Sequence, residues 1–207
     1  MTAYTDINRI SLLRYRVIYA DPPWLFESRS EKGDGRNPNQ DYDCMPTAEI
    51  AALPVHQMAS KDCVLFLWVT NPMLPDGLAV MRAWGFKYKA VGFTWAKATK
   101  QGLNGDPVRP LKDEFNWRMN NGYWTRQNTE HCLIGTMGDI ARRPDARNVR
   151  ELLIAGSGAD KSQKPIEAYE RIERLVDGPY LELFARNTRR GWDSFGNEVF
   201  KYGERNS

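Results

Sequence analysis

The sequence has few residues of the kinds that bind metal ions or form disulfides. Its 207 residues include only two histidines, His56 and His131, and neither stands beside a Cys-x-x-C pair, so we expect no metal site. The three cysteines, Cys44, Cys63 and Cys132, are isolated from one another and odd in number. This pattern argues against a disulfide framework and is typical of proteins from a reducing cytoplasm.

Long apolar runs and nucleotide-binding glycine motifs are also missing. No run approaches the roughly 20 residues of a membrane-spanning helix, and no charged leader precedes an apolar stretch at the N-terminus. We therefore expect a soluble, cytoplasmic protein with no membrane partner. The dinucleotide fingerprint G-x-G-x-x-G is absent. Two near matches, Gly156-Ser157-Gly158 and Lys161-Ser162, lack the flanking residues of a hydrolase nucleophile elbow and of a phosphate-binding P-loop, which argues against a nucleotide hydrolase.

The residues that are present fit one globular domain. A hydrophobic content of 42% is enough for a core in a chain of this length, and there is no internal repeat or low-complexity tract. We therefore expect a single domain over residues 1–207. Seven tryptophans are many and suggest stacking surfaces in addition to core. The net charge of +3 permits a nucleic-acid partner without requiring one.

Predicted strands alternate with predicted helices along the chain. Apolar, β-branched runs predict strands at residues 16–20, 62–70, 87–95, 130–136, 151–155 and 180–184. Apolar periodicity and helix-end signals predict helices at 47–58, with Thr47 as N-cap, at 71–84 and at 165–176. This alternation predicts an α/β fold with a mostly parallel, doubly wound sheet.

The first predicted strand ends on the motif Asp21-Pro22-Pro23-Trp24. In open α/β sheets, ligands bind at the carboxyl ends of strands. An Asp in a turn usually accepts from the backbone N–H groups that follow it, but prolines have none, so the Asp21 carboxylate is available and the turn is stiff. We predict that the Asp21 carboxylate and the Pro22 carbonyl hold both amino hydrogens of an adenine, so that its lone pair faces a methyl donor. Trp24 would stack on the base; the alternative is a Pro-rich turn with a packed Trp.

This motif resembles the catalytic motif of the N(6)-adenine methyltransferases typified by the S-adenosylmethionine-binding subunit of the eukaryotic mRNA methyltransferase. The resemblance extends over nearly the whole chain, because seven further family blocks recur in the same order. They are residues 64–70, 94–97, 130–135, 164–165, 172–175, 182–184 and 192–197. The resemblance implies a Rossmann-like methyltransferase fold with S-adenosylmethionine as cofactor. It also implies a permuted order, in which the catalytic strand precedes the cofactor strand.

The resemblance further implies which side chains surround the cofactor. Asp6 and Ile7 would flank its adenine, and Lys97 would pair with its carboxylate. The other cofactor-binding candidates, around the ribose and the amino-acid part, are Asp21, Glu182, Arg186, Thr188, Asn197 and Glu198. Thr188 and Glu198 stand where the mRNA enzyme has histidine and glutamine, so individual ribose contacts stay open. Asp6 in an N-terminal tail, and a simple ion pair of Glu182 with Arg186, are the alternatives.

Two long irregular segments leave strand ends on the catalytic edge of the predicted sheet. Both are too long to be simple connections. Residues 25–42 are predicted to form a lid over the target base, and residues 97–123 interleave basic with aromatic side chains, which suits phosphates and exposed bases. The substrate-binding candidates are Tyr42, Lys100, Arg109, Trp117, Arg118 and Trp124. Solvated loops with a few packed aromatics are the alternative.

Together these features predict methyl transfer from S-adenosylmethionine to the exocyclic amino group of adenine in nucleic acid. The chain is similar in size to bacterial and phage members of the family, so we expect DNA as the substrate in preference to RNA. The same reaction on RNA adenosine is one alternative. A non-catalytic, nucleic-acid-binding partner subunit is another, although such subunits have lost the acidic motif that is intact here. A homodimer or an association with a partner subunit is left open.

Overall fold

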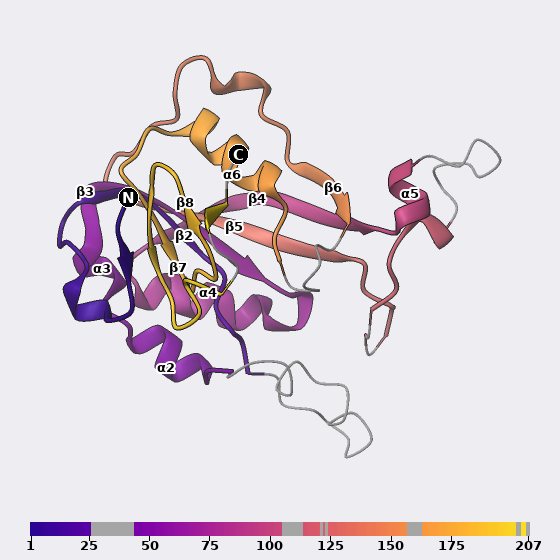
Figure 1. Ribbon diagram of the computed structural model, residues 1–207, viewed down its shortest axis with the longest axis horizontal. Coiled ribbons are helices and arrows are strands. Elements are labelled where there is room, and N and C mark those ends of the chain that lie inside the picture. Colours follow the sequence, from indigo (N-terminus) through magenta and orange to yellow (C-terminus); the bar gives the residue numbers. More distant parts are fainter. Residues whose placement is uncertain are drawn as a thin grey trace.

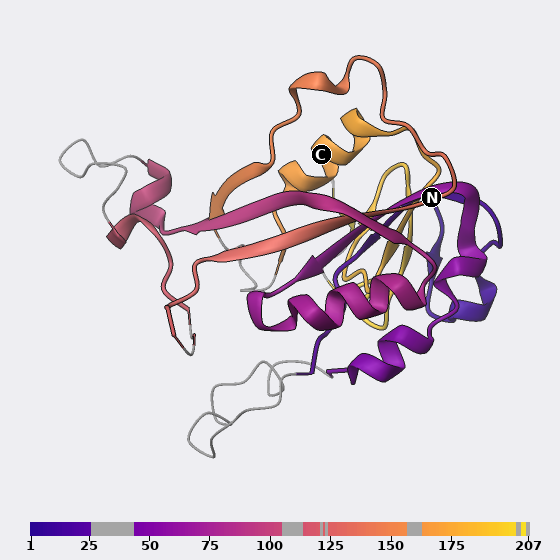
Figure 2. The same cartoon turned by 180° about the vertical axis from the view of Figure 1, so that it is seen from behind.

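The computed structural model describes residues 1–25, 44–104, 114–120, 122, 124–156, 163–201 and 204–205. Within this part an eight-stranded sheet crosses the molecule and helices cover both of its faces (Figure 1). The helices are α2 (Thr47–Ala52), α3 (Val55–Met58), α4 (Leu74–Ala83), α5 (Lys100–Asn104) and α6 (Ile166–Leu175). Helix α6 lies on one face, and α2, α3 and α4 lie on the other, an arrangement that is also seen from behind (Figure 2). None of the helices described has the length and apolar character of a bilayer-spanning segment.

The strand order of the sheet is β1-β9-β7-β2-β3-β5-β4-β6. The strands are β1 (Ala3–Tyr4), β2 (Tyr15–Ala20), β3 (Ala59–Val69), β4 (Lys87–Ala98), β5 (Thr129–Met137), β6 (Leu152–Gly156), β7 (Tyr180–Leu183) and β9 (Trp192–Phe195). Strand β5 runs antiparallel to both of its neighbours, and the other pairings in this sheet are parallel. The short strands β8 (Thr188–Arg189) and β10 (Glu204–Arg205) pair separately. The predicted mostly parallel, doubly wound sheet is therefore confirmed.

The strand order also confirms the permuted chain order. Strand β2, which carries the Asp-Pro-Pro-Trp motif at its end, pairs in parallel with β7, which comes late in the chain. Their register aligns Ala20 with Leu183. Because the next residue on each strand leaves the sheet at the same edge, Asp21 and Phe184 emerge side by side although they are far apart in sequence.

Strand β2 is buried on both faces, as its unbroken apolar sequence predicts. Val17 and Tyr19 pack into the cluster under α6, and Ile18 and Ala20 pack into the cluster under α2, α3 and α4. A strand held from both sides fixes the position of the residue that follows it. The Asp21 carboxylate is therefore presented from one of the most constrained elements of the molecule.

The predicted helix at 47–58 is wrong in two details. The structure has two helices, α2 and α3, because the chain becomes extended at Leu53 and Pro54 cannot continue the first helix. Thr47 is the first helical residue and not the N-cap, which is Pro46. The Thr47 hydroxyl instead donates to Asp76 of α4 at 3.0 Å, so it joins two helices.

The N-terminal segment joins the sheet, in contrast to the alternative of an N-terminal tail. Strand β1 pairs with β9 in parallel. The buried carboxylate of Asp193 in β9 accepts from the backbone N–H of Thr2 at 2.6 Å and from the Tyr15 hydroxyl at 2.9 Å. One carboxylate thus ties the start of the chain to the edge of the sheet beside β7.

Candidate active site

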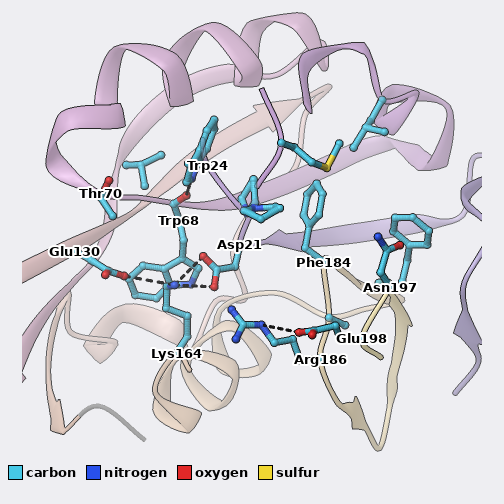
Figure 3. A pocket seen from close by; sticks show the side chains of 18 residues that line it. Asp21, Trp24, Trp68, Thr70, Glu130, Lys164, Phe184, Arg186, Asn197 and Glu198 are labelled. Carbon is cyan, nitrogen blue, oxygen red and sulfur yellow. Dashed lines mark hydrogen bonds and ion pairs between the residues drawn. The ribbon is translucent and has the colours of Figure 1, made fainter. Parts of the chain in front are cut away.

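A cavity of about 310 Å³ opens where β2, β3 and β7 end (Figure 3). Strand β5 starts at the same edge because it runs antiparallel to β3. Polar side chains that line the cavity include Asp21, Thr70, Glu130, Lys164, Arg186 and Glu198. A concave site with apolar walls and a few convergent charged groups, at the carboxyl edge of a mostly parallel sheet, is a typical ligand site of α/β folds.

The Asp21 carboxylate faces the cavity and is paired with Lys164. The Lys164 ammonium donates to both carboxylate oxygens, at 2.7 Å and 2.6 Å (Figure 3). Burial raises the pKa of the Asp21 carboxyl, and the opposing effect of Lys164 only partly offsets this. The nearby Glu130 carboxylate raises the Asp21 pKa further. Asp21 is therefore a carboxylate whose charge depends on its neighbours.

Lys164 is the site residue that sequence reasoning missed. It lies directly before Pro165, which is the N-cap residue of α6, and its side chain is only 8% exposed. The pair Lys164-Pro165 was recognised as one of the blocks shared with the family, but nothing in the local pattern indicated a partner. That partner, Asp21, is 143 positions away in sequence. The signal that could have found Lys164 is a lysine directly before the proline that opens a predicted helix after a strand end.

The turn after Asp21 is stiff, and its backbone carbonyls have partners. The Trp24 N–H donates to the Pro22 carbonyl at 2.9 Å, and the Met45 N–H donates to the Pro23 carbonyl at 2.8 Å. A carbonyl oxygen has two lone pairs, so the Pro22 oxygen has capacity for one further donor. The turn is thus anchored by its own backbone and by the segment that leads into α2.

Trp24 does not offer the open stacking face that its sequence position suggested. It is only 4% exposed and belongs to the core cluster under α2, α3 and α4, with part of it at the cavity wall. Its indole N–H donates to the Trp68 carbonyl at 3.0 Å, and the Trp68 indole N–H donates to the Tyr19 hydroxyl at 2.7 Å. In this structure Trp24 therefore shapes and stiffens the cavity wall. This position agrees with the alternative prediction, a proline-rich turn with a packed tryptophan.

Lys97 lies behind the cavity wall and does not line the cavity, in contrast to the position expected for a residue that pairs with the cofactor carboxylate. Its ammonium pairs with Oε1 of Glu130, and Glu130 Oε2 lies 3.4 Å from the Lys164 ammonium. Burial opposes ionisation of Glu130, but Lys164 and Lys97 outweigh it and hold the pKa of Glu130 below its usual range. Lys164, and not Lys97, is the lysine that reaches the cavity.

The opposite side of the cavity is built from two closely packed backbone segments. Phe184 follows β7 with φ of 63°, in the left-handed region that is strained for a bulky residue. Gly196 approaches the backbone of Ala185 so closely that a Cβ would lie 2.1 Å from the Ala185 oxygen. This packing turns Arg186 and Glu198 toward the cavity, where Arg186 Nε lies 3.9 Å from a Glu198 carboxylate oxygen (Figure 3). Asn197 lines the same wall.

The remaining cofactor-binding candidates lie near this wall and not on it. Glu182 accepts from the Tyr169 hydroxyl at 2.8 Å, and Thr188 is buried in β8. Asp6 caps the short 3₁₀ turn Ile7–Arg9 by accepting from the Asn8 N–H at 2.9 Å. Ile7 packs against the core cluster under α2, α3 and α4. These residues are absent from the set that lines the cavity in the described chain.

Four of the candidate substrate residues lie on a projection that we call the arm, comprising the described residues of 99–128. Helix α5 extends beyond the ends of β4 and β5 (Figure 1). Trp117 bridges to Ala98, Lys100 and Arg118 are exposed, and Trp124 is 93% exposed. Tyr42 and Arg109 lie outside the described residues. Most of the predicted lid at 25–42 also lies outside them, as do Ser157 and Gly158 of the Gly-Ser-Gly sequence.

The charges around the cavity suit a zwitterionic ligand with a polar sugar. Lys164 and Arg186 could bind a carboxylate, Asp21 or Glu198 an ammonium group, and Asn197 ribose hydroxyls. Among the residues described, no group of three or more His, Cys, Asp or Glu is arranged to hold a metal ion.

Comparisons with known proteins point to one family. The MT-A70 family model matches residues 15–198. The type II methyltransferase M.MunI of a Mycoplasma species is 31% identical over 202 residues, which cover 90% of this chain and 78% of that protein. Human N(6)-adenine-specific methyltransferase METTL4 is 30% identical over 92% of this chain and 39% of its own length. A putative N(6)-adenosine-methyltransferase MT-A70-like of Medicago truncatula is 30% identical over 90% of this chain and 26% of its own length.

Proposed function

This chain belongs to the MT-A70 family of N(6)-adenine methyltransferases, and we propose that it transfers a methyl group from S-adenosylmethionine to the exocyclic amino group of adenine in DNA. The family match bears out the resemblance drawn from the sequence. DNA is favoured because the chain covers 78% of a type II methyltransferase but only 26% of a plant adenosine methyltransferase. The observation that carries the proposal is the Asp21 carboxylate, which faces the cavity beside two proline carbonyls.

Asp21 and Pro22 would orient the target amine. The lone pair of an adenine amino group is delocalised into the ring and is a poor nucleophile. An ionised carboxylate only accepts hydrogen bonds, so Asp21 can hold one amino hydrogen while the Pro22 carbonyl holds the other. With both hydrogens held, the lone pair points out of the hydrogen-bonding plane. Pro23 stiffens the turn, and Trp24 fixes it from the core.

Four cavity residues would hold the cofactor, whose sulfonium supplies an electrophilic methyl group. Lys164, Arg186, Asn197 and Glu198 line the cavity, where the two cations would bind the cofactor carboxylate and the other two would bind its ribose. Asp6, Ile7, Glu182 and Thr188 come from the elements behind this wall and would complete the adenine and ribose contacts. Glu182 is already oriented by the Tyr169 hydroxyl.

Asp21 would also receive the proton that the reaction releases. The cofactor would supply the methyl group to the amino nitrogen and would keep the electron pair of the broken carbon–sulfur bond. The nitrogen then carries one hydrogen too many, and one of the two hydrogens already points at Asp21. Because burial raises the Asp21 pKa, this carboxylate is a better proton acceptor than an exposed one. The proton then leaves to solvent.

The arm would bind the nucleic acid around the target. Lys100 and Arg118 are exposed cations that can meet phosphates, and Trp117 and Trp124 offer ring surface for neighbouring bases. Arg109 and Tyr42 belong to the same proposal from sequence alone. A target in a duplex must be flipped out of the stack, at a cost of a few kcal/mol that a single strand mostly avoids.

The test is to incubate the protein with isotope-labelled S-adenosylmethionine and either DNA or RNA, digest both to nucleosides and identify the labelled product by mass. We expect N(6)-methyldeoxyadenosine from DNA. Label confined to RNA adenosine would replace the substrate class in the proposal. Binding of S-adenosylmethionine and of nucleic acid without any labelled nucleoside would instead indicate a non-catalytic partner subunit.

A further inference from the structure

Four charged side chains form a continuous row beside the cavity, in the order Asp21, Lys164, Glu130 and Lys97. Lys164 contacts both carboxylates, and Glu130 contacts both lysines. The members come from four separate elements, namely the end of β2, the residue before Pro165, strand β5 and strand β4. We call this set the charge row, and its first three members are visible in Figure 3. Two cations and two anions make it neutral overall.

The charge row is largely buried and its lysines are fixed in place. The side chains of Lys97, Glu130, Lys164 and Asp21 are 8%, 13%, 8% and 25% exposed. The Lys164 ammonium lies 5.5 Å from the centre of the Trp68 ring, and the Lys97 ammonium lies 4.6 Å from the centre of the Trp95 ring. Charges that are shielded from water and held this close affect one another far more strongly than exposed pairs do.

Lys164 stands between two carboxylates that compete for one cation. Its ammonium is 2.6 Å from the nearer Asp21 oxygen and 3.4 Å from Glu130 Oε2. Glu130 in turn has its second oxygen occupied by Lys97. The charge on Lys97 therefore decides how strongly Glu130 draws Lys164 away from Asp21.

We propose that Glu130 and Lys97 are positioning residues that divide the Lys164 charge between two carboxylates and thereby set the ionisation of the catalytic Asp21. This rests on the proposed role of Asp21 in methyl transfer. Neither Glu130 nor Lys97 needs to touch the reacting atoms, since both act through Lys164.

The arrangement predicts shifts of opposite sign for the two residues. Glu130→Gln removes the competing anion, so Lys164 no longer divides its charge between Asp21 and Glu130, and Asp21 ionises at lower pH. Lys97→Met leaves Glu130 with Lys164 as its cation in the row, so Asp21 loses part of its partner and ionises at higher pH. In the double variant Lys97 has no Glu130 carboxylate to act on, so Asp21 should titrate close to the pH found for Glu130→Gln alone.

No other charged group facing Asp21 is altered by these substitutions. Besides Lys164 and Glu130, the groups of the described residues that interact with it include Arg186, Tyr19 and Cys132. Burial raises the pKa values of the Tyr19 hydroxyl and the Cys132 thiol, so both stay neutral over the working range. Arg186 keeps its charge throughout.

The experiment measures the Asp21 titration directly, by carboxyl ¹³C NMR of aspartate-labelled protein without cofactor or substrate. The resonance of Asp21 is identified by its loss in Asp21→Asn. We expect displacements of about one pH unit, downward for Glu130→Gln and upward for Lys97→Met. Glu170→Gln on α6 and Lys89→Met on β4 are exposed controls of the same chemical type and should leave the titration unchanged.

Displacements of the same sign in both variants, or none in folded protein, would overturn the proposal. Should Glu130→Gln fail to fold, Lys97→Met decides the question: an upward displacement relative to Lys89→Met upholds the proposal, and no displacement overturns it. The pH–rate profile of methyl transfer should follow the same displacements. Opposite NMR shifts without any methyl transfer would uphold the charge row and refute the proposed function. Methyl transfer with unmoved NMR titrations would uphold the proposed function and refute the role of the charge row.

Discussion

At the scale of single residues, Lys164 connects the late part of the chain, from which it comes, with Asp21 in the early part. It holds both oxygens of Asp21, and the Asp21 pKa is already raised by burial. Asp21 must be ionised to accept the amino hydrogens, so activity is lost as the pH falls through its raised pKa. Removing Lys164 raises that pKa further and moves this loss to higher pH.

Lys164→Met should therefore lower the methyl-transfer rate at neutral pH by ~10²–10³-fold, the usual effect of removing one preorganised charged group. The acid limb of the pH–rate profile should move to higher pH. In Lys164→Arg the acid limb should lie close to its wild-type pH, because arginine keeps the positive charge. Lys89→Met is the exposed control. An unmoved acid limb in Lys164→Met would mean that this lysine does not govern the Asp21 charge.

The residues of the site differ in how far sequence can predict them. Asp21 was found because its chemistry is local, in a turn whose prolines offer it no N–H. The position of Lys164 depends on which strands become neighbours, which no local pattern specifies. Trp24 was expected to stack because an indole beside a strand end suits both packing and stacking. Only the tertiary structure shows that its ring is buried.

At the scale of elements, helix α4 packs against β3, and Gly77 makes this close contact possible. A Cβ on Gly77 would lie 2.3 Å from Cγ1 of Val69, and a β-branched side chain has little freedom to move away. Gly77→Ala should therefore destabilise the protein by roughly 1–2 kcal/mol, because the clash exceeds the ~1 kcal/mol that alanine gains over glycine in a helix.

Denaturant unfolding measures this effect, and two variants serve as its controls. In a Val69→Ala background, Gly77→Ala should cost little, because the clashing methyl group is gone. Ala79→Gly on the exposed side of the same helix should cost only about 1 kcal/mol. A Gly77→Ala protein that is more stable than the parent would show that α4 shifts freely over the sheet.

The arm is the element that should read the nucleic acid. Trp124→Ala should change the preference for bases next to the target, since a stacked base contributes ~1–3 kcal/mol, and should leave stability unchanged because Trp124 is 93% exposed. Arg118→Ala should lower affinity about equally for all sequences and reduce the log–log salt slope by about one unit. Methylation of a randomised oligonucleotide pool at two salt concentrations tests both. Unchanged preference in Trp124→Ala would place base reading elsewhere.

Elements were predictable where burial dictates their sequence. The central strands β2 and β3 were predicted because residues 17–20 and 63–69 are apolar and buried, as is typical of strands covered on both faces. The direction of β5 was not, because an apolar run looks the same in either orientation. The break between α2 and α3 follows from Pro54, whose effect on the predicted helix was underestimated.

The permuted chain order matters at the scale of the whole molecule, because it places early and late segments around one cavity. Asp21 comes from the start of the chain, whereas Lys164, Arg186 and Asn197 come from its last quarter. A ligand bound across this cavity would therefore join both parts and stabilise the whole fold. The family resemblance predicted this juxtaposition, whereas composition and periodicity alone predicted only the α/β class.

S-adenosylmethionine at 100 times its Kd should add ~2.7 kcal/mol to the unfolding free energy, which corresponds to a rise in Tm of about 5–10 °C for a chain of this size. Calorimetry of the protein with and without cofactor measures it. Arg186→Ala should lose most of this rise, and Lys89→Met should keep it. An equal rise in Arg186→Ala would remove Arg186 from the cofactor site.

The most direct test of the central claim, that Asp21 is the catalytic carboxylate of an adenine methyltransferase, is to measure single-turnover methyl transfer to DNA adenine by wild-type protein and Asp21→Asn. The amide keeps the shape but loses the charge, and its NH₂ end would face the amine with a donor. We predict N(6)-methyladenine from the wild type and a rate at least ~10²–10³-fold lower in the variant, with S-adenosylmethionine affinity within a few-fold of the wild type. Near-wild-type turnover by Asp21→Asn, or methylation of a different base, would contradict the account.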